Sequence, residues 1–228
     1  MTPLKLTWKL ASPIVVSAFP LHLDALVAFA MAEEGKQQDL AGWDMNATLE
    51  LPIERAVRGD LGCWKASALL PVEPGEHSMR FWTKKSDPYD YATRLEAGQL
   101  DVMTKMPLKP YGIKFDQVRG QFKQMYKWLP VRSVRQVQAW CVGDEDRLNE
   151  LLAPLAGYIT YLGAKTRMGY GRVIDFTMEA DETANDCWSK RILPWQDDGC
   201  IQVEAATQPP YWDINNRRAA WLHPDIYN

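Results

Sequence analysis

The sequence predicts an α+β fold: a ferredoxin-like (RRM-like) domain with a large central insertion, β-rich and irregular, and a carboxyl-terminal extension. Two observations lead to this prediction. A strand pattern followed by a helix pattern occupies the amino-terminal part, and a strand, a helix and a second strand follow one another between residues 133 and 180. This is the element order of a split βαβ unit. We therefore expect a domain over residues 1–179, interrupted by an insertion at about 45–132, with residues 180–228 packed against it.

The amino-terminal elements show two different hydrophobic periods. Apolar residues alternate along LKLTWKL (residues 4–10), which is the period of a half-buried strand. They recur at helical spacing along LHLDALVAFAMAEE (residues 21–34), and Gly35 predicts the end of this helix. The runs ATLELPI, CWKASALL and SMRFWTK, between residues 47 and 84, predict short strands separated by Pro, Gly and Asp.

The carboxyl-terminal elements follow a stretch without clear periodicity. Four prolines interrupt residues 86–130, so we expect no long element there, although residues 114–128 fit a hairpin or a short helix with an extended arm. A strand is predicted over residues 133–142, followed by a helix with an acidic first turn that Pro154 must kink or divide. The run RVIDFTMEA (residues 172–180) predicts the closing strand.

Charge is distributed unevenly along the chain, although the formal net charge is only −3. The segment 103–135 carries eight cations and one acid, a charge of +7 that leaves −10 for the remainder. Aromatic residues lie between the cations, and this mixture is typical of a surface that binds single-stranded nucleic acid. The alternative is an exposed cationic arm whose aromatics pack inward. The RNA contacts predicted in this segment are Arg119, Lys123, Tyr126, Lys127 and Arg132.

A second basic segment, YLGAKTRMGYGRV (residues 161–173), combines three glycines and three cations with no acid. It lies between a predicted helix and a predicted strand, whereas phosphate loops follow a strand and open a helix, so NTP and NAD binding are disfavoured. Its glycines permit positive φ angles, and its cations attract a polyanion such as RNA. The alternative is a tight turn with solvated cations. The RNA contacts predicted here are Gly163, Lys165, Arg167, Gly169, Tyr170, Gly171 and Arg172.

Several stretches together resemble a known family. The helix, the run LGAKTRMGYGRV and the strand after it resemble the glycine-rich loop of the RAMP proteins of CRISPR systems. The opening LKLTWKLASPIVVSAFPLHLDALVAFA and the late PPYW are similar to the Cas-five-type RAMP subunit of type IV CRISPR effector complexes. The similarity runs from Leu4 to Trp212, with a looser match in the middle third.

The resemblance implies a role and a set of partners. Such a subunit holds the 5′ handle of the crRNA, caps the filament of backbone RAMP subunits and contacts the large subunit. Pairing with the guide then reads the target sequence, while the protein reads RNA backbone and shape. Target DNA near the adjacent motif and a recruited helicase are further partners to test.

No pattern predicts a metal site, a cofactor or catalysis. The four cysteines and three histidines are scattered without metal-ligand spacing, and Ser12, Ser67 and Ser78 lack a GxSxG context. His22 is the candidate for an alternative function, metal-independent cleavage of precursor crRNA. We expect it instead to pack or cap at the start of the first helix, where Asp24 is an available partner.

A second alternative is a carbohydrate-binding module, because ten tryptophans are many for this length and indole rings stack on sugars. We expect most of them to be core or interface anchors; the tryptophans considered are Trp64, Trp82, Trp188, Trp195, Trp212 and Trp221. No stretch approaches the roughly 18 apolar residues of a membrane span, and the start lacks a signal-peptide cleavage site. We therefore expect a cytoplasmic protein without membrane contact.

Overall fold

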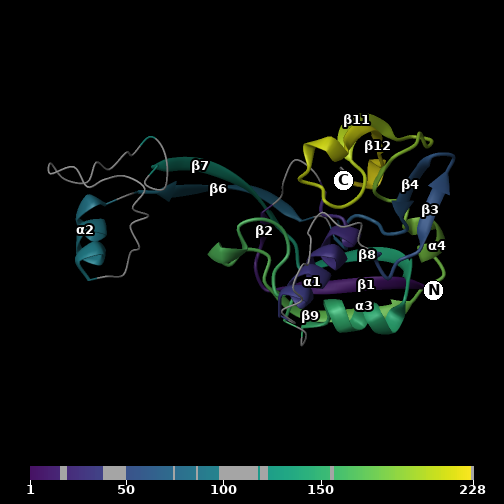
Figure 1. The fold of residues 1–228 in the computed structure, drawn as a ribbon, viewed down its shortest axis with the longest axis horizontal. Coiled ribbons are helices and arrows are strands. Elements are labelled where there is room, and N and C mark those ends of the chain that lie inside the picture. The colour runs from purple at the N-terminus through teal and green to yellow at the C-terminus, as the bar shows by residue number, and fades with distance from the viewer. Residues whose placement is uncertain are drawn as a thin grey trace. The chain divides into compact units, whose positions relative to one another are not determined.

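The structure, a computed structural model, describes residues 1–15, 20–37, 50–73, 75–85, 87–97, 118, 123–154 and 157–226. The chain divides into two compact units (Figure 1). Met1–Ser78 and Val131–Asn228 form the first unit, and Met79–Pro130 form the second.

The first unit is built on a four-stranded antiparallel sheet in the order β5-β8-β1-β9. In its centre, β1 (Thr2–Leu10) pairs with β8 (Gln136–Gly143) on one side and with β9 (Val173–Ala180) on the other. The short β5 (Leu70–Pro71) pairs with the outer side of β8. Because side chains alternate along a strand, the even-numbered apolar residues of β1 all point to one face: Leu4, Leu6, Trp8 and Leu10.

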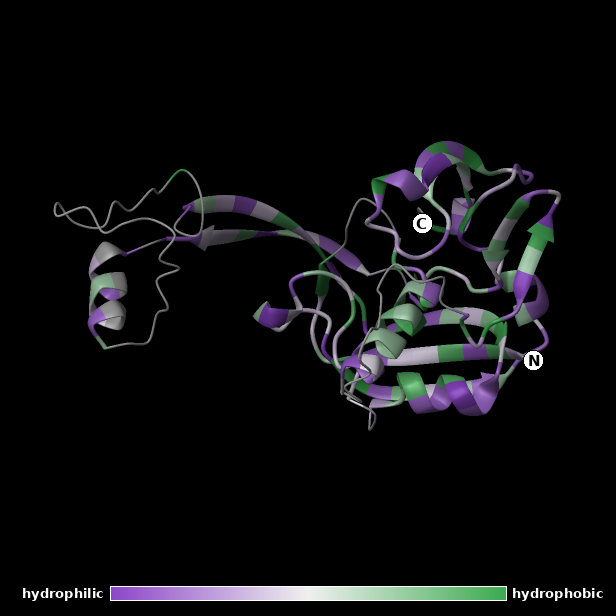
Figure 2. Ribbon diagram, viewed as in Figure 1, coloured by the Kyte–Doolittle hydropathy of each residue, from purple (hydrophilic) through white to green (hydrophobic). Residues whose placement is uncertain are grey.

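Two helices cover this apolar face. The helices α1 (Leu23–Gln37) and α3 (Glu145–Leu152) contact each other, and their apolar residues join those of β1 in one buried cluster. The carboxylate of Asp144 caps α3 by accepting a hydrogen bond from the N–H of Arg147 at 3.1 Å. Figure 2 shows hydrophobic and hydrophilic residues mixed along α3, as expected for a helix with one buried side.

The opposite face of the sheet carries charges that are already paired. Across the pair of β1 and β9, the Nζ of Lys5 lies 3.3 Å from the carboxylate of Glu179. The Nζ of Lys9 lies 2.7 Å from the carboxylate of Asp175. The lysines of this face are thus neutralised by neighbours on the adjacent strand.

The carboxyl-terminal residues form a second sheet in the order β10-β12-β11. Its strands are β10 (Ile192–Leu193), β11 (Ile201–Ala206) and β12 (Arg217–Leu222). Before it, the short helix α4 (Ala184–Cys187) contacts β8 and β1. A hairpin of β3 (Arg55–Arg58) and β4 (Leu61–Trp64) shares a buried cluster with Leu193 of β10 and with Trp195, so this sheet is packed into the first unit.

The strands β6 (Glu76–Lys84) and β7 (Met125–Ser133) each have residues in both units. They are neighbours in a three-stranded sheet that is completed by β2 (Ile14–Val15). The second unit also contains the helix α2 (Pro88–Glu96). At its start the carboxylate of Asp87 accepts a hydrogen bond from the N–H of Tyr89 at 2.9 Å.

The α+β class is confirmed, and so are most of the predicted elements. Two predictions were wrong. The helix α1 continues through Gly35 to Gln37, because this glycine has an ordinary helical φ rather than the left-handed conformation of a helix end. The helix α2 occupies a stretch predicted to be irregular, and it begins at a proline, which is tolerated at the first helical position. The strand predicted over residues 47–53 lies partly outside the described residues, and Ile53 makes only an isolated bridge.

Candidate nucleic-acid interface

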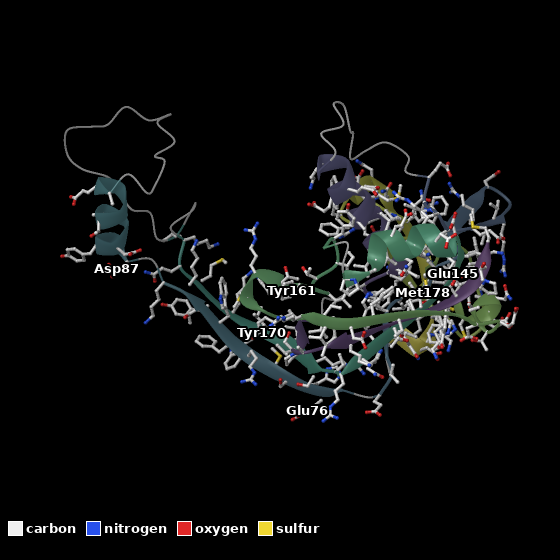
Figure 3. All side chains as sticks on the ribbon, turned by 90° about the horizontal axis from the view of Figure 1, so that it is seen from below. Glu76, Asp87, Glu145, Tyr161, Tyr170 and Met178 are labelled. Atoms are coloured by element: carbon white, nitrogen blue, oxygen red, sulfur yellow. The ribbon has the colours of Figure 1, made fainter. Side chains whose placement is uncertain are left out.

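The predicted glycine segment forms a loop, residues 161–172, that closes on itself and on the start of the chain; Figure 3 labels Tyr161 within it. The N–H of Leu162 donates to the carbonyl of Gly171 at 2.8 Å, and Tyr161 forms a β-bridge with Arg172. A further bridge joins Ala164 to Val15 of β2. We call this segment the glycine loop.

The three glycines of the loop have different structural roles. All have positive φ angles, between 70° and 84°, in the left-handed region that favours glycine. A Cβ at Gly171 would also clash with the carbonyl of Leu162, and one at Gly163 would lie 2.7 Å from Cγ1 of Ile14. A Cβ at Gly169 would meet nothing within 4 Å. Packing therefore requires glycine at two positions, whereas Gly169 is required only for its backbone angle.

The predicted cations of the loop, Lys165, Arg167 and Arg172, are all exposed. Among the described residues, Lys165 is the only non-glycine with a positive φ, 60°, and it begins the short 3-10 turn Thr166–Met168. Within the residues that the structure describes, the side chains of Arg167 and Arg172 make no ion pair. Both guanidinium groups are therefore available to a phosphate, unlike the paired lysines of the sheet.

Two further predicted contacts belong to the same region of the first unit. Tyr170 is half-buried within the glycine loop. The strand β2 pairs with β7 through Ile14 opposite Arg132 and Val15 opposite Val131. Because Val15 also bridges to Ala164, β2 connects the strand that carries Arg132 to the glycine loop. The sequence did not predict that these two basic segments are connected in this way.

Three other predicted contacts lie in the second unit: Lys123 just before β7, and Tyr126 and Lys127 near the amino-terminal end of that strand. Arg119 is outside the described residues. There the ring of Phe81 on β6 lies 6.4 Å from that of Tyr126 and 5.0 Å from that of Trp128. These rings are exposed by 56%, 58% and 63%, and we call them the aromatic cluster. Lys127 is exposed and points to the other face of β7, because side chains alternate along a strand.

The aromatic cluster corrects two points of the sequence analysis. The alternative of an arm whose aromatics pack inward is wrong for Tyr126 and Trp128, which are both exposed. Phe81 was missed, because the run SMRFWTK was considered only as a strand. The signal was present in that run, where Arg80 and Lys84 flank Phe81 in the same mixture of cations and aromatics.

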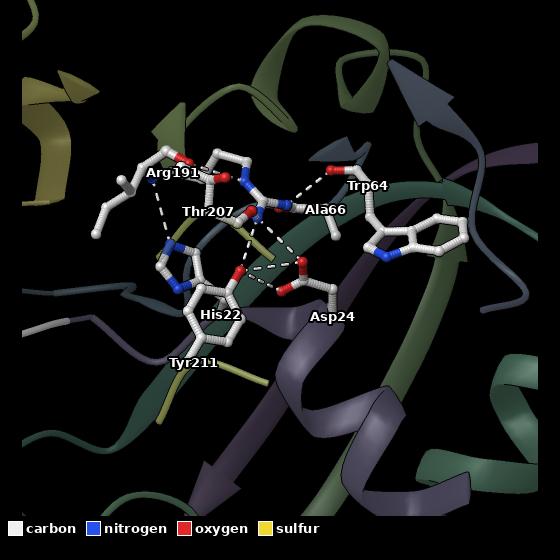
Figure 4. A network of polar contacts seen from close by, with 8 residues as sticks. His22, Asp24, Trp64, Ala66, Arg191, Thr207 and Tyr211 are labelled. Atoms are coloured by element: carbon white, nitrogen blue, oxygen red, sulfur yellow. Dashed lines mark hydrogen bonds and ion pairs between the residues drawn. The ribbon is translucent and has the colours of Figure 1, made fainter. Parts of the chain in front are cut away.

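A buried polar network lies elsewhere in the first unit, around Arg191 (Figure 4). Its guanidinium group donates to the carboxylate of Asp24 at 3.0 Å and to the hydroxyl of Tyr211 at 2.7 Å. The Tyr211 hydroxyl in turn donates to the same carboxylate at 2.9 Å. The guanidinium also donates to four carbonyl groups, those of Trp64, Ala66, Ile192 and Thr207. Asp24 and Arg191 are fully buried, so this network holds the carboxyl-terminal extension on the start of α1.

His22 belongs to this network and not to an exposed site. Its ring stacks on Tyr211 with centroids 4.7 Å apart, and its Nε2 accepts a hydrogen bond from the N–H of Ile192 at 3.2 Å. Burial, together with the charge of Arg191, holds the pKa of His22 well below 6.5. The expected packing at the helix start is confirmed, with Ile192 and Tyr211 as the partners.

Two of the six tryptophans considered above, Trp64 and Trp195, are core residues, and three others are half-buried: Trp82, Trp188 and Trp221. Of these six only Trp212 is exposed, by 67%. The rings of Trp64 and Trp195 are buried beneath the guanidinium groups of Arg55 and Arg58, at 4.9 Å and 5.1 Å. They therefore offer no open row of indole rings for a sugar.

Two general properties of the described residues bear on ligands. Within them, no three His, Cys, Asp or Glu side chains are grouped so that they could hold a metal ion. None of the helices in these residues is both long and apolar enough to cross a membrane.

Comparison with known proteins agrees with the resemblance of the glycine loop and the opening segment. The family model of CRISPR type IV associated protein Csf3 matches residues 2–223. The chain belongs to this family. Members of the Csf3 family are Cas5-like RAMP proteins, and membership in a type IV CRISPR-associated family implies partner subunits. No curated protein matches the chain.

The match to the Csf3 family spans both polar regions of the first unit. Asp24 lies in the stretch PLHLDAL and Tyr211 in PPYW, the two stretches that pointed to type IV systems. In the structure these two residues share a hydrogen bond inside the buried network. Both stretches therefore contribute residues to the buried network, whereas the glycine loop presents exposed cations.

Proposed function

We propose that this member of the Csf3 family is a non-catalytic crRNA-binding subunit of a type IV CRISPR ribonucleoprotein. In this proposal it anchors the 5′ handle of the crRNA at the glycine loop and caps the backbone filament next to the large subunit, for guide-directed DNA targeting. One observation carries the RNA-binding part: Arg167 and Arg172 are exposed and, within the described residues, without ion pairs, on a loop whose backbone is fixed by hydrogen bonds. Guanidinium groups in this state bind phosphate through paired N–H donors.

The arrangement of the first unit supports a ferredoxin-like RAMP domain. The helix α1 follows β1, the helix α3 connects β8 to β9, and the sheet order is β5-β8-β1-β9. This order is compatible with a split βαβ fold in which the central insertion separates β5 from β8. The glycine loop then lies between the second helix and the closing strand, as in the RAMP resemblance.

The distribution of paired and unpaired charge favours the loop over the sheet as the phosphate site. The sheet lysines Lys5 and Lys9 already have carboxylate partners, so a phosphate would have to displace an acid to reach them. The loop arginines require no such displacement. The aromatic cluster of the second unit supports a separate contact, since exposed aromatic rings stack on unpaired bases with little sequence preference.

The state of His22 supports the non-catalytic part of the proposal. A general acid or base must reach the proton that it transfers, and it works best with a pKa near the ambient pH. His22 is only 2% exposed, and burial lowers its pKa well below 6.5. Its single acceptor atom, Nε2, is used by Ile192. The nuclease alternative therefore has no accessible candidate in His22.

The proposal is tested with RNA that co-purifies with the assembled complex. This RNA is sequenced, and an oligonucleotide of its 5′ handle is titrated with the full-length chain over a series of salt concentrations. We expect Arg167→Ala and Arg172→Ala each to weaken binding about tenfold, as for the loss of a charge-assisted hydrogen bond of ~1.5 kcal/mol. Each should also lower the slope of log K against log salt by about 0.7 to 1, as for one lost phosphate contact.

The charge-matched control is Lys9→Ala, which removes one exposed cation that is already paired with Asp175. We expect it to leave the salt slope close to that of the wild type. If both arginine variants keep the wild-type slope, the glycine loop does not contact phosphate and the proposal is wrong.

A further inference from the structure

The glycine loop is held by a turn that lies 160 residues earlier in the chain. The hydroxyl of Ser12, between β1 and β2, donates to the carbonyl of Gly169 at 2.7 Å and accepts from the N–H of Arg172 at 2.9 Å. We propose that Ser12 is a positioning residue for RNA binding, which fixes the glycine loop in the conformation that presents its arginines. This inference rests on the proposed function of the loop.

The residues on either side of Ser12 complete the attachment. The N–H of Ala11 donates to the carbonyl of Arg172 at 2.8 Å, and the N–H of Gly171 donates to the carbonyl of Pro13 at 2.8 Å. Three consecutive residues of the turn thus bind the end of the loop through backbone or side chain. Of these three residues, only Ser12 also reaches Gly169, so among the described residues its hydroxyl is the group that joins Gly169 to Arg172.

A hydroxyl is the group that this position requires. It donates one hydrogen bond and accepts another through the same oxygen, so it can join a carbonyl and an N–H that are three residues apart in the loop. Alanine has neither function, and a carboxylate would accept but not donate. The next residue is Pro13, which restricts Ser12 to extended backbone angles, and threonine and valine adopt these angles readily.

The span that Ser12 closes contains two of the three glycines of the loop. Gly169 and Gly171 lie within it, both at positive φ, and glycine loses more conformational freedom on ordering than any other residue. A Cβ at Gly169 would meet nothing within 4 Å, so packing does not fix this residue. The hydrogen bond to its carbonyl therefore orders the loop before RNA binds. The free-energy cost of ordering the loop then does not reduce the affinity for RNA.

Positioning can be separated from charge, because Ser12 carries none. Loss of an arginine removes a phosphate contact and lowers the salt slope. Loss of the Ser12 hydroxyl leaves every cation in place, so it should weaken binding while the salt slope stays the same. A role limited to global stability would change neither the affinity of the folded protein nor the slope.

The experiment uses Ser12→Val and Ser12→Thr in the full-length chain, a nearly isosteric pair that differs in one hydroxyl. The probe is the 5′-handle oligonucleotide with the sequence of the co-purified RNA. We expect Ser12→Val to weaken binding about three- to tenfold with an unchanged salt slope, and Ser12→Thr to remain within about twofold of the wild type. Hydrogen exchange at the amide of Arg172 should be at least about tenfold faster in Ser12→Val than in Ser12→Thr.

The outcomes distinguish this inference from the proposed function. If Arg167→Ala and Arg172→Ala lower the salt slope but Ser12→Val and Ser12→Thr bind RNA equally, the loop binds phosphate and the role of Ser12 is refuted. If the arginine variants have no effect, the proposed function fails and the inference fails with it. If Ser12→Val does not fold, Ser12→Ala replaces it; binding by Ser12→Ala as tight as by the wild type overturns the inference.

Discussion

The first unit contains two clusters of polar residues that differ in burial and pairing. Around Arg191, a cation and the carboxylate of Asp24 are fully buried and bonded to each other. In the glycine loop, Arg167 and Arg172 are exposed and, within the described residues, have no acidic partner. The two clusters have similar chemical groups, so their surroundings determine what each of them does.

This difference in burial and pairing predicts that one cluster stabilises the fold and the other binds a ligand. A buried charge must keep its partner, because leaving it alone costs several kcal/mol, and it cannot exchange that partner for a ligand. An exposed cation contributes little to folding and is free to bind a phosphate. Changes at the buried cluster should therefore alter the free energy of unfolding, and changes at the two loop arginines should alter affinity for RNA.

The largest expected effect concerns Arg191→Met. This change leaves the carboxylate of Asp24 buried with only the Tyr211 hydroxyl and a backbone N–H to satisfy it. We expect the free energy of unfolding to fall by about 3 to 5 kcal/mol, measured by urea denaturation. Binding of RNA by the folded fraction of this variant should have the same salt slope as binding by the wild type.

The control for Arg191→Met is the double change Asp24→Leu with Arg191→Met. Replacing both charges by apolar side chains removes the uncompensated carboxylate, so a large part of the lost stability should return. If the double variant is as unstable as the single one, the hydrogen bonds of Arg191 to the carbonyls of Trp64, Ala66 and Thr207 dominate, and not the ion pair.

A smaller effect is expected inside the loop, where two of its glycines can be compared with each other. Gly171→Ala combines left-handed strain with a clash against the carbonyl of Leu162, and we expect a loss of about 2 to 5 kcal/mol. Gly169→Ala has the strain alone, since nothing lies within 4 Å, so the loss should be about 1 to 2 kcal/mol. Both losses can be measured by urea denaturation. Equal losses would mean that the loop relaxes around the new Cβ of residue 171.

The sequence predicted the elements whose hydrophobic period is strong. The strand over residues 4–10 and the helix over residues 21–34 are both present, because each buries one regular apolar face. The division of the helix near Pro154 was also predicted, and α3 ends at Leu152. Pairing between distant strands was not predicted, because it depends on contacts such as those of β2 with β7 that leave no local pattern.

The sequence predicted which residues of the candidate site are exposed cations, but it did not predict the contacts that hold the loop in place. The exposed cations of the loop were named from the sequence, since glycines and unopposed charges form a local pattern. The contribution of Ser12 could not be found, because its partners are separated from it by more than 150 residues. The burial of Arg191 was missed for the same reason, although its place before the apolar run ILPW was a weak signal.

The smallest expected effect depends on pH, because the buried cluster contains a histidine and the glycine loop contains none. Burial lowers the pKa of His22 below 6.5 in the folded chain. Below pH 6.5 the unfolded chain therefore binds a proton that the folded chain does not, and the free energy of unfolding falls as the pH falls. The expected slope from this group is at most ~1.4 kcal/mol per pH unit.

The measurement compares the wild type with His22→Gln by urea denaturation between pH 7.5 and about 5, a window chosen around the ordinary histidine pKa. Glutamine keeps an acceptor for the N–H of Ile192 and has no titrating group. Burial raises the pKa of Asp24, which acts in the opposite direction in acid, but both proteins contain Asp24, so the difference between their slopes isolates His22. Parallel slopes would mean that His22 is protonated in the folded chain as readily as in the unfolded chain. The imidazole would then be open to solvent, and the distinction between a closed cluster and an open loop would fail at that residue.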